Sequence, residues 1–331
     1  MVTIKIVIAD YQGSMMPTHK LEQAVLQAGL PDAQVVVYEY HDEMKDEFYQ
    51  IMADVDALLT GFIHVDAELL AHAAQLKVVS VNATGYDNVD LDAARVSGVG
   101  VACIGEYCTE DVAEFTLTQM LALVKNVQAY VQDVEERQNW NYAYAAPRPR
   151  LSELTLGIFG LGKIGLCVAQ KARALGMRVL AYDPYTIQAE AARQSGVKLC
   201  ATASEVLTKS DVITNHMNLN ETNVDFFDAA KFGQMARQPY FLNMARGGCV
   251  VERDLVHALD SGQLKGAALD VLADEQPRLA GHPLLGRENV LVTPHAAFYS
   301  QTSLKKLQEI SCQNIVHYLK GETDLVFKLV K

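Results

Sequence analysis

The sequence predicts an α/β protein made of two doubly wound domains, each with a parallel sheet at its centre. Short, β-rich apolar runs alternate with helical patterns along the whole chain, which is typical of sheets covered by helices. The 331 residues exceed what one hydrophobic core usually organises. A stretch rich in proline and aromatic residues, "NWNYAYAAPRPR" at residues 139–150, separates two series of predicted strands and indicates a loop between the two bodies.

The first series of predicted strands occupies the first third of the chain. Its runs are "IKIVIAD", "QVVVYEY", "VDALLTG", "LKVVSVN" and "GVGVACIG", with helical patterns such as "HKLEQAVLQAGL" and "VDAELLAHAAQ" between them. This set makes a complete small doubly wound unit. A long amphipathic stretch follows over residues 110–138, with acidic residues in its first turn, where they suit the helix dipole.

The second series begins after residue 150. Its predicted strands are "TLGIFG", "MRVLAYD", "VKLC", "DVITNHM", "PYFLNM", "GAALDV" and "NVLVTP", and a helix fits in every gap. The final segment, "SLKKLQEISCQNIVHYLKG", is helical but comes after this series has closed, so it can return to the first body. We therefore expect one domain from residues 1–102 plus 300–331 and a second from residues 103–299.

Composition limits the possible partners and compartment. The net charge is −12, and no block of lysine or arginine is present, which disfavours nucleic acid and anionic membranes as partners. No apolar run approaches the roughly 20 residues that span a bilayer, and the start of the chain has no leader pattern, so a cytoplasmic location is expected. The six cysteines form no CxxC pair and are expected to be buried, reduced thiols.

A glycine pattern opens the second series. Gly160, Gly162 and Gly165 form GxGxxG between a predicted strand and a helix, and the next strand ends in Asp183. Glycines at this turn let a pyrophosphate approach the helix N-terminus, while the acid accepts a hydrogen bond from a ribose hydroxyl. An acid would repel a 2′-phosphate, so NAD(H) is favoured over NADP(H). The alternative is a plain glycine turn with Asp183 solvated at a strand end.

Three polar residues follow late strands, where open α/β sheets place their ligands. They are Arg246 in "NMARGG", Glu275 in "LDVLADEQP" and His295 in "TPHAAF". An arginine can hold the carboxylate of a 2-oxo acid and polarise its carbonyl, and a histidine can supply the proton as a hydride arrives. The acid would favour the charged imidazole. Taken singly, each is more often an ordinary loop residue, and only their joint placement indicates catalysis.

These motifs resemble the D-isomer-specific 2-hydroxy acid dehydrogenase family over nearly the whole chain. The similarity is densest in "ATGYDNVDLDAARVSGVGV", "LGIFGLGKIG", "YDPY", "NMARGGCVVERDLVHAL", "KGAALDV" and "TPHAAFYS". The resemblance implies a Rossmann NAD-binding domain inserted into a flavodoxin-like substrate domain, to which the final helix returns. It also implies NADH-dependent reduction of a 2-oxo acid to the D-2-hydroxy acid, no metal, and a homodimer formed through the nucleotide domain with residues 110–138 as the arm.

The resemblance also implies a role for individual positions. The catalytic arginine, acid and histidine are Arg246, Glu275 and His295. The cofactor contacts correspond to Gly160, Gly162, Lys163, Ile164, Gly165, Asp183, Met217, Asn218, Thr222, Met244, Ala245, Asp270 and Ala297, with Asp270 holding the nicotinamide amide. The substrate contacts correspond to Phe62, Thr84, Gly85, Arg246, His295 and Phe298, with the backbone N–H groups of Thr84 and Gly85 binding the carboxylate.

Three departures from the family pattern bear on these roles. Ala83 stands where glycine is commoner, and Asn218 stands where many members have proline or glycine. The usual acid-then-proline ending is stretched to "EQP", so either Glu275 or Gln276 can be the partner of His295, and we favour Glu275. A glutamine partner would be the arrangement of formate dehydrogenases and would leave the imidazole without a charged neighbour.

The substrate and the class of protein each leave an alternative open. The stretch "TGFIHV" has no basic cluster, which disfavours phosphoglycerate. Phe298 and Tyr299 suit an apolar or aromatic 2-oxo acid, while glyoxylate and hydroxypyruvate remain possible. "TPHAAFYS" and "LNETN" also resemble the C-terminal-binding-protein corepressors, so the alternative function is an NAD(H)-sensing protein-binding module with little turnover.

Overall fold

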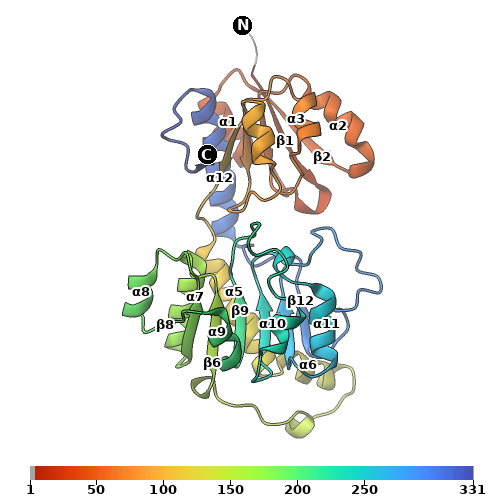
Figure 1. Cartoon of the computed structure of the whole chain (residues 1–331). Helices are drawn as coiled ribbons and strands as arrows, with labels where there is room; N and C mark the ends of the chain where they lie inside the picture. Colours follow the sequence, from red (N-terminus) through yellow and green to blue (C-terminus); the bar gives the residue numbers. More distant parts are fainter. Residues whose placement is uncertain (1–3, 331) are drawn as a thin grey trace. The chain divides into compact units, whose positions relative to one another are not determined.

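The structure is a computed structural model that describes residues 4–330 and divides them into two compact units (Figure 1). Unit 1 contains the described residues up to Tyr107 and from Ser300 onward, and unit 2 is Cys108–Tyr299. Residues 103–107, which were expected in the second domain, lie in unit 1. The reason is local: Cys103 ends a strand of the unit 1 sheet, and the hydroxyl of Ser303 donates a hydrogen bond to Tyr107 O at 3.2 Å.

Unit 1 is a doubly wound sheet with strand order β13-β5-β4-β3-β1-β2. All strand pairs are parallel except β13 with β5, which is antiparallel. The elements are β1 (Lys5–Tyr11), α1 (Lys20–Gly29), β2 (Gln34–Tyr40), α2 (Lys45–Met52), β3 (Ala57–Thr60), α3 (Ala67–His72), β4 (Val78–Val81), α4 (Leu91–Val96), β5 (Gly100–Cys103), α12 (Gln301–Leu319) and β13 (Leu329–Val330).

Both faces of the unit 1 sheet are buried, and successive residues of β1 alternate between them. Ile6 and Ile8 pack with Leu26 of α1 and Ile315 of α12 on one face. Val7 and its neighbours on the other face pack against α2 and α3, chiefly through aromatic and aliphatic side chains. This explains why the strands read as continuous apolar runs. Figure 1 shows α12, at the blue end of the chain, beside α1 near the red end.

Unit 2 is a parallel sheet with strand order β12-β11-β10-β9-β6-β7-β8, the order of a Rossmann domain. Its elements are α5 (Thr109–Val124), α6 (Val127–Glu135), β6 (Thr155–Phe159), α7 (Lys163–Ala174), β7 (Arg178–Tyr182), α8 (Ala189–Gln194), β8 (Lys198–Leu199), α9 (Ala203–Lys209), β9 (Val212–Asn215), α10 (Ala229–Gly233), β10 (Tyr240–Asn243), α11 (Glu252–Asp260), β11 (Gly266–Leu269) and β12 (Val290–Val292). The predicted fold class, two parallel-sheet α/β domains, is confirmed.

The core of unit 2 lies on both faces of this sheet. On one face, Phe159, Phe241 and Leu255 belong to a cluster that joins the strands to α9, α10 and α11. On the other face, α5 packs against α7 and against β10, β11 and β12. The chain reverses direction across the sheet between β6 and β9, so the carboxyl ends of these two strands flank the position where such sheets bind ligands.

The amphipathic stretch at residues 110–138 is not one helix. It is divided into α5 and α6 at Asn126, which has a left-handed backbone with φ of 54°. Asparagine tolerates this conformation better than most residues with a Cβ. Val127, Val131 and Val134 of α6 are 48%, 47% and 41% exposed. Because these three residues lie three or four positions apart, they form an apolar stripe on one face of α6.

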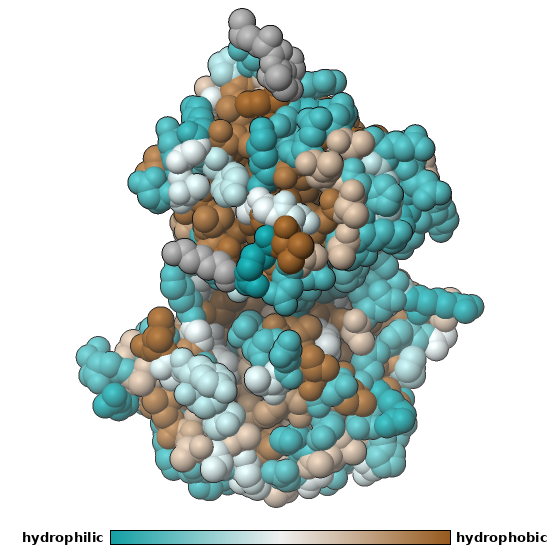
Figure 2. Space-filling view, turned by 45° about the horizontal axis from the view of Figure 1, so that its top comes forward, coloured by the Kyte–Doolittle hydropathy of each residue, from teal (hydrophilic) through white to brown (hydrophobic). Residues whose placement is uncertain are grey.

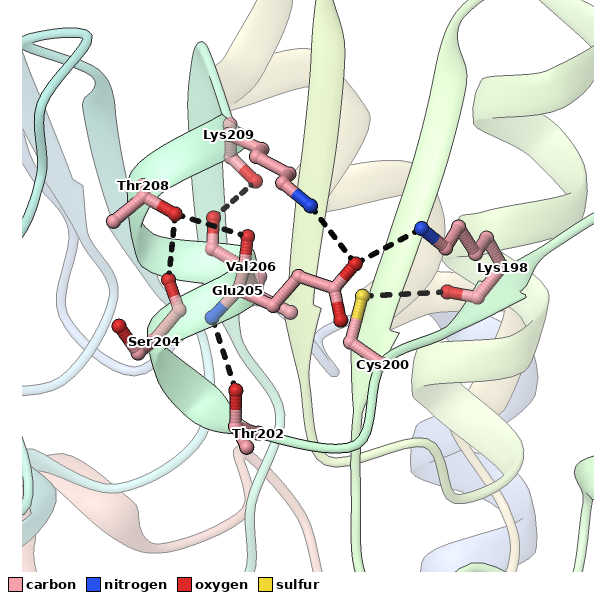
Figure 3. Close-up of polar contacts among 9 residues, drawn as sticks. Lys198, Cys200, Thr202, Ser204, Glu205, Val206, Thr208 and Lys209 are labelled. Atoms are coloured by element: carbon pink, nitrogen blue, oxygen red, sulfur yellow. Dashed lines mark hydrogen bonds and ion pairs between the residues drawn. The ribbon is translucent and has the colours of Figure 1, made fainter.

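Helix α9 shows how local polar contacts hold an element of unit 2 (Figure 3). The hydroxyl of Thr202 accepts a hydrogen bond from Glu205 N at 3.3 Å and caps the helix. The Glu205 carboxylate accepts bonds from Lys198 at 2.9 Å and Lys209 at 3.0 Å, which lowers its pKa to about 2. The pair with Lys198 ties α9 to strand β8, and the pair with Lys209 lies within the helix.

The surface is largely hydrophilic (Figure 2), and the cysteine thiols lie inside. Hydrophilic residues make up much of the face shown in Figure 2, with smaller apolar patches between them. All six cysteines are buried, and none of them forms a disulfide within residues 4–330. Among residues 4–330, no helix combines the length and the apolar character that crossing a membrane requires.

Candidate functional site in the nucleotide unit

The glycine loop between β6 and α7 is shaped by close backbone contacts. Gly160 has a φ of 83°, and a Cβ on it would lie 2.6 Å from the backbone N of Met217 in the loop after β9. A Cβ on Gly165 would collide with Gly160 O. Only glycine fits at these two positions, because the turn is left-handed at the first and the helix lies against the loop at the second.

The third glycine has a different surrounding. No atom lies within 4 Å of the position that a Cβ on Gly162 would take, and Gly162 is the N-cap of α7 without a side-chain cap. The space beside Gly162, at the start of this twelve-residue helix, is therefore open, and the helix dipole favours an anion at this end. The residues present fit the pyrophosphate of a dinucleotide.

Asp183 directly follows β7 and organises this loop. Its Oδ2 accepts a hydrogen bond from Leu161 N at 2.8 Å, and its Oδ1 accepts one from Tyr185 N at 2.9 Å. The carboxylate is therefore held in place by two backbone amides at the end of the strand next to the glycine loop. Each carboxylate oxygen has a second acceptor site, which suits a ribose hydroxyl.

Two buried asparagines at the ends of β9 and β10 were not predicted as site residues. Asn215 Nδ2 donates to Asn243 Oδ1 at 3.1 Å, and Asn243 Nδ2 donates to Arg246 O at 2.9 Å. Asn243 Oδ1 also accepts from Ala245 N at 3.2 Å. This amide ladder sets the path of the backbone that carries Arg246. The sequence signal was an asparagine that ends an apolar run in both "DVITN" and "YFLN".

Arg246 follows β10 on an extended backbone with φ of −141°. Its Nη1 donates to Ala245 O at 2.9 Å, which braces the guanidinium against its own loop. The next residue, Gly247, lies so close to Leu272 O that a Cβ would collide with it. Arg246 is thereby held between the ends of β10 and β11, and a guanidinium with five N–H donors suits a carboxylate ligand.

His295 and Glu275 form a hydrogen-bonded pair. His295 Nδ1 lies 2.9 Å from Glu275 Oε2. Gln276 instead turns its backbone N–H to Asp274 Oδ1 at 2.9 Å. The structure therefore places the glutamate, and not the glutamine, against the imidazole. The two side chains are 25% and 39% exposed, so the pair is accessible to solvent.

Asp270, at the end of β11, fixes the turn that carries His295. Its carboxylate accepts hydrogen bonds from the Thr293 hydroxyl at 2.6 Å and from the backbone N–H groups of Ala296 and Ala297. Its carbonyl oxygen accepts from His295 N at 2.7 Å. His295 has a left-handed φ of 51°, a conformation that costs a residue with a Cβ about 1–2 kcal/mol. The bonds to Asp270 maintain it. Burial raises the pKa of Asp270, and these hydrogen bonds oppose the rise.

The polar groups of the loop after β9 form hydrogen bonds with one another. Met217 N donates to Asn215 Oδ1 at 3.1 Å, and Asn218 O accepts from Asn223 Nδ2 at 2.6 Å. The Thr222 hydroxyl donates to Asn220 Oδ1 at 2.6 Å. Of Met217, Asn218 and Thr222, only Met217 lies against the glycine loop, at Gly160, and its amide already has an acceptor in its own loop.

The remaining positions of the nucleotide unit lie in the same loops. Ala245 precedes Arg246, and Met244 and Ala297 are buried beside them, at 7% and 5% exposure. The ring of Phe298 meets that of His295 edge-on, with centroids 6.2 Å apart. Lys163 and Ile164 begin α7. The residues assigned to the cofactor therefore lie at the carboxyl ends of neighbouring strands of one parallel sheet.

Unit 1 has its own candidate loop at the carboxyl end of β4. The backbone N–H groups of Thr84 and Gly85 find no acceptor within residues 4–330, whereas Ala83 O accepts a bond from Ile104 N at 3.0 Å. Two adjacent amides without a protein acceptor suit a carboxylate. Phe62 lies in the loop after β3, next to β4 in the sheet.

Comparison with known proteins agrees with this geometry. Residues 117–297 match the model of the D-isomer specific 2-hydroxyacid dehydrogenase NAD binding domain. The chain is 33% identical over 287 residues to a hydroxypyruvate reductase of Blautia hydrogenotrophica, covering 83% of this chain and 86% of that one. It is 30% identical over 297 residues to a glyoxylate reductase of Thermofilum pendens, covering 87% and 86%.

A solved structure extends the likeness to both units. A D-lactate dehydrogenase from Aquifex aeolicus, complexed with NAD and lactic acid, has a TM-score of 0.86 to this chain at 25% identity, covering 98% of each chain. The match covers the doubly wound fold of unit 1 as well as the Rossmann fold of unit 2. The chain belongs to the D-isomer specific 2-hydroxyacid dehydrogenase family and is an oxidoreductase that uses NAD(H).

Proposed function

We propose that the protein reduces a 2-oxo acid to the D-2-hydroxy acid with NADH, in a reversible reaction. The observation that carries the proposal is the His295–Glu275 hydrogen bond at the carboxyl edge of the Rossmann sheet, one strand away from the Arg246 loop. A bound NADH supplies a hydride to C2 of the acid. The protein must then hold the carboxylate, polarise the carbonyl and protonate its oxygen.

Arg246 and His295 divide these tasks. Arg246 binds the carboxylate and the carbonyl oxygen through charge-assisted hydrogen bonds. His295 donates its proton from Nε2 to the oxygen, because Glu275 contacts Nδ1 and directs the other ring nitrogen towards the substrate. The carboxylate of Glu275 accepts a charge-assisted hydrogen bond from the imidazolium and orients the ring.

The cofactor is held by backbone and carboxylate groups of unit 2. The N-terminus of α7, open at Gly162, binds the pyrophosphate, and Asp183 binds the adenosine ribose and disfavours a 2′-phosphate. Asp270 binds the nicotinamide amide while it holds the His295 turn. Within unit 1, the Thr84 and Gly85 amides suit the carboxylate of the acid and Phe62 its side chain; within unit 2, Phe298 adjoins the ring of His295.

The test is NADH oxidation against glyoxylate, hydroxypyruvate, pyruvate, branched 2-oxo acids and phenylpyruvate, in the wild type and in His295→Ala. General acid catalysis contributes about 10²–10⁴-fold, so the variant should lose at least a hundredfold in kcat. His282→Ala is the matched control, because His282 lies in the same unit with its imidazole 3.6 Å from the carboxylate of Glu252. Tight NADH binding without turnover of any acid would contradict the proposal and favour a cofactor-sensing binding protein.

We further propose that the protein is a homodimer whose contact includes α6 and the loop that follows it. The apolar stripe of α6 consists of Val127, Val131 and Val134, and Trp140 and Tyr142 in the loop that follows are both 92% exposed. Monomers rarely expose contiguous apolar side chains of this size. An identical stripe on a second copy would cover it in a two-fold arrangement.

A further inference from the structure

Asp10 is a buried carboxylate at the carboxyl end of β1 to which the proposed reaction gives no role. It is 6% exposed. Its Oδ2 accepts a hydrogen bond from Gly61 N at 2.7 Å, and its Oδ1 accepts from Phe62 N at 3.2 Å and from Tyr11 N at 3.0 Å. All three donors are backbone amides, and two of them belong to the loop that follows β3. Asp10 therefore joins the ends of two strands.

These two strands flank the point where the unit 1 sheet reverses its winding. From β1 the chain crosses to β2 on one side and then returns to β3 on the other. In open α/β sheets the ligand crevice lies outside the carboxyl ends of the strands at this point. The loop that Asp10 holds is therefore at the position in unit 1 where a ligand is expected.

Close packing makes the loop depend on Asp10. A Cβ on Gly61 would lie 2.9 Å from Asp10 Oδ2 and 3.8 Å from Asn82 Cβ, so the backbone at Gly61 passes between the two side chains. Ile63 is 1% exposed and anchors the far side of the loop in the core. The residue between these fixed points is Phe62, whose N–H is held by Asp10.

The charges around Asp10 indicate a positioning role more than an ion pair. Burial raises the pKa of Asp10 to about 6, and the three backbone N–H bonds oppose the rise. Two titratable residues adjoin it in the sheet: Glu39 lies opposite Asp10 on β2, and the phenol of Tyr11, the next residue, donates to Asp42 Oδ1 at 3.1 Å. No lysine or arginine contacts Asp10 among residues 4–330. Its partners are the loop amides.

We infer that Asp10 is a positioning residue that holds the Gly61–Phe62 loop and, through Phe62, sets the selectivity for the side chain of the 2-oxo acid. The inference rests on the function proposed above. Phe62 is half-buried in the loop at the ligand edge of unit 1, and its aromatic ring is the group of this loop that we expect to meet the side chain of the acid. Asp10 should therefore matter for acids that carry a side chain and not for glyoxylate, which carries hydrogen there.

The experiment compares kcat and KM for phenylpyruvate, hydroxypyruvate and glyoxylate in wild type, Asp10→Asn and Gly61→Ala. Gly61→Ala disturbs the same contact between Gly61 and Asp10, because its Cβ would press against the Asp10 carboxylate. It keeps the test possible if Asp10→Asn does not fold. Asp56→Asn is the matched control. Asp56 is 4% exposed and also accepts a backbone N–H, that of Lys5 at 2.8 Å, but it lies at the opposite end of the same strands.

We expect Asp10→Asn and Gly61→Ala to raise KM for the two acids with side chains by about tenfold, the loss of one hydrogen bond to a charged group. KM for glyoxylate and kcat should stay within about twofold in both variants, and Asp56→Asn should leave all values unchanged. Three results would overturn this inference but not the proposed function. They are unchanged KM values in the Asp10 and Gly61 variants, a rise in KM for glyoxylate as large as for the other acids, and an equal rise in Asp56→Asn. A wild type that turns over no 2-oxo acid would overturn the proposed function and this inference with it.

Discussion

His295 is held by two carboxylates with different tasks. Asp270 fixes the backbone on both sides of it, and Glu275 contacts the ring. The bonds to Asp270 keep the backbone of His295 in a left-handed conformation that it would otherwise leave. The imidazole ring is therefore held in one orientation at the ligand edge of the sheet. The division explains why an acid must follow β11 directly and a second must follow a few residues later.

Replacing Glu275 by glutamine should lower kcat for 2-oxo acid reduction by about tenfold, because His295 loses a charged hydrogen-bond partner. The amide can still accept a hydrogen bond from His295 Nδ1 but lacks the charge of the carboxylate. The measurement is kcat for the best substrate. Gln276→Ala is the control, since Glu275 and not Gln276 is bonded to Nδ1, and an identical loss in that variant would remove the Glu275–His295 pair from the mechanism.

His216 should make unit 2 sensitive to acid. Burial lowers its pKa to about 4, and its Nε2 lies 3.0 Å from the Thr214 hydroxyl. The unfolded chain therefore binds more protons between pH 6.5 and 4, and the free energy of unfolding falls as the pH falls through this window. The loss is at most about 3 kcal/mol, because part of the residue stays exposed.

Urea unfolding at pH 8 and pH 5, followed by circular dichroism, measures this effect. His216→Gln should unfold with a smaller difference between the two pH values than the wild type, since glutamine has no charge to gain. Asp10 acts in the opposite direction, because its raised pKa lets the folded state bind more protons between pH 3.8 and 6. The contribution of His216 is therefore the difference in pH dependence between the wild type and His216→Gln. An equal change in the free energy of unfolding in both proteins would show that His216 does not contribute.

At the scale of elements, short helices such as α9 depend on their caps. Thr202→Ala should lower the free energy of unfolding by about 1 kcal/mol, because Glu205 N loses its acceptor. Ser204→Ala, in the same helix, is the control, since the cap bond comes from Thr202. Thermal unfolding of both variants is the measurement, and an equal loss in both would indicate that helix propensity, not the cap, decides.

The elements that the sequence predicted share a strong local signal. β1, β6 and β10 are buried on both faces, and they were predicted as unbroken apolar runs. β13 was not predicted, because two residues carry no periodicity and its pairing with β5 joins segments more than two hundred residues apart. The break at Asn126 was missed because the apolar pattern continues through it.

The residues of the candidate site likewise fall into those that the sequence predicted and those that it did not. Glycine spacing and strand-end polar residues predicted the positions of Gly160, Asp183 and His295, because these signals are local. The Asn215–Asn243 bond was not predictable, since it depends on β9 and β10 being neighbours in the sheet. The choice between Glu275 and Gln276 likewise depends on the path of a loop, which spacing alone does not determine.

At the scale of the whole molecule, the proposed dimer can be tested on α6. Val131→Glu places a charge in the centre of the apolar stripe and should convert a dimer to a monomer in sedimentation velocity, with a mass near half that of the wild type. Val96→Glu is the control, because Val96 is 89% exposed on unit 1 and lies outside the stripe. A wild type that sediments as a monomer, or a Val131 variant that stays dimeric, would contradict the proposal.

Unit 1 is assembled from both ends of the chain, and this has a consequence for synthesis. Its β1 residues Ile6 and Ile8 leave the ribosome before unit 2, whereas α12, which covers them with Cys312 and Ile315, follows unit 2. Unit 2 is continuous and can fold while the ribosome is still at work. A nascent chain therefore carries one exposed apolar sheet face while the whole of unit 2 is translated, and chaperones that recognise such faces should bind it until α12 emerges.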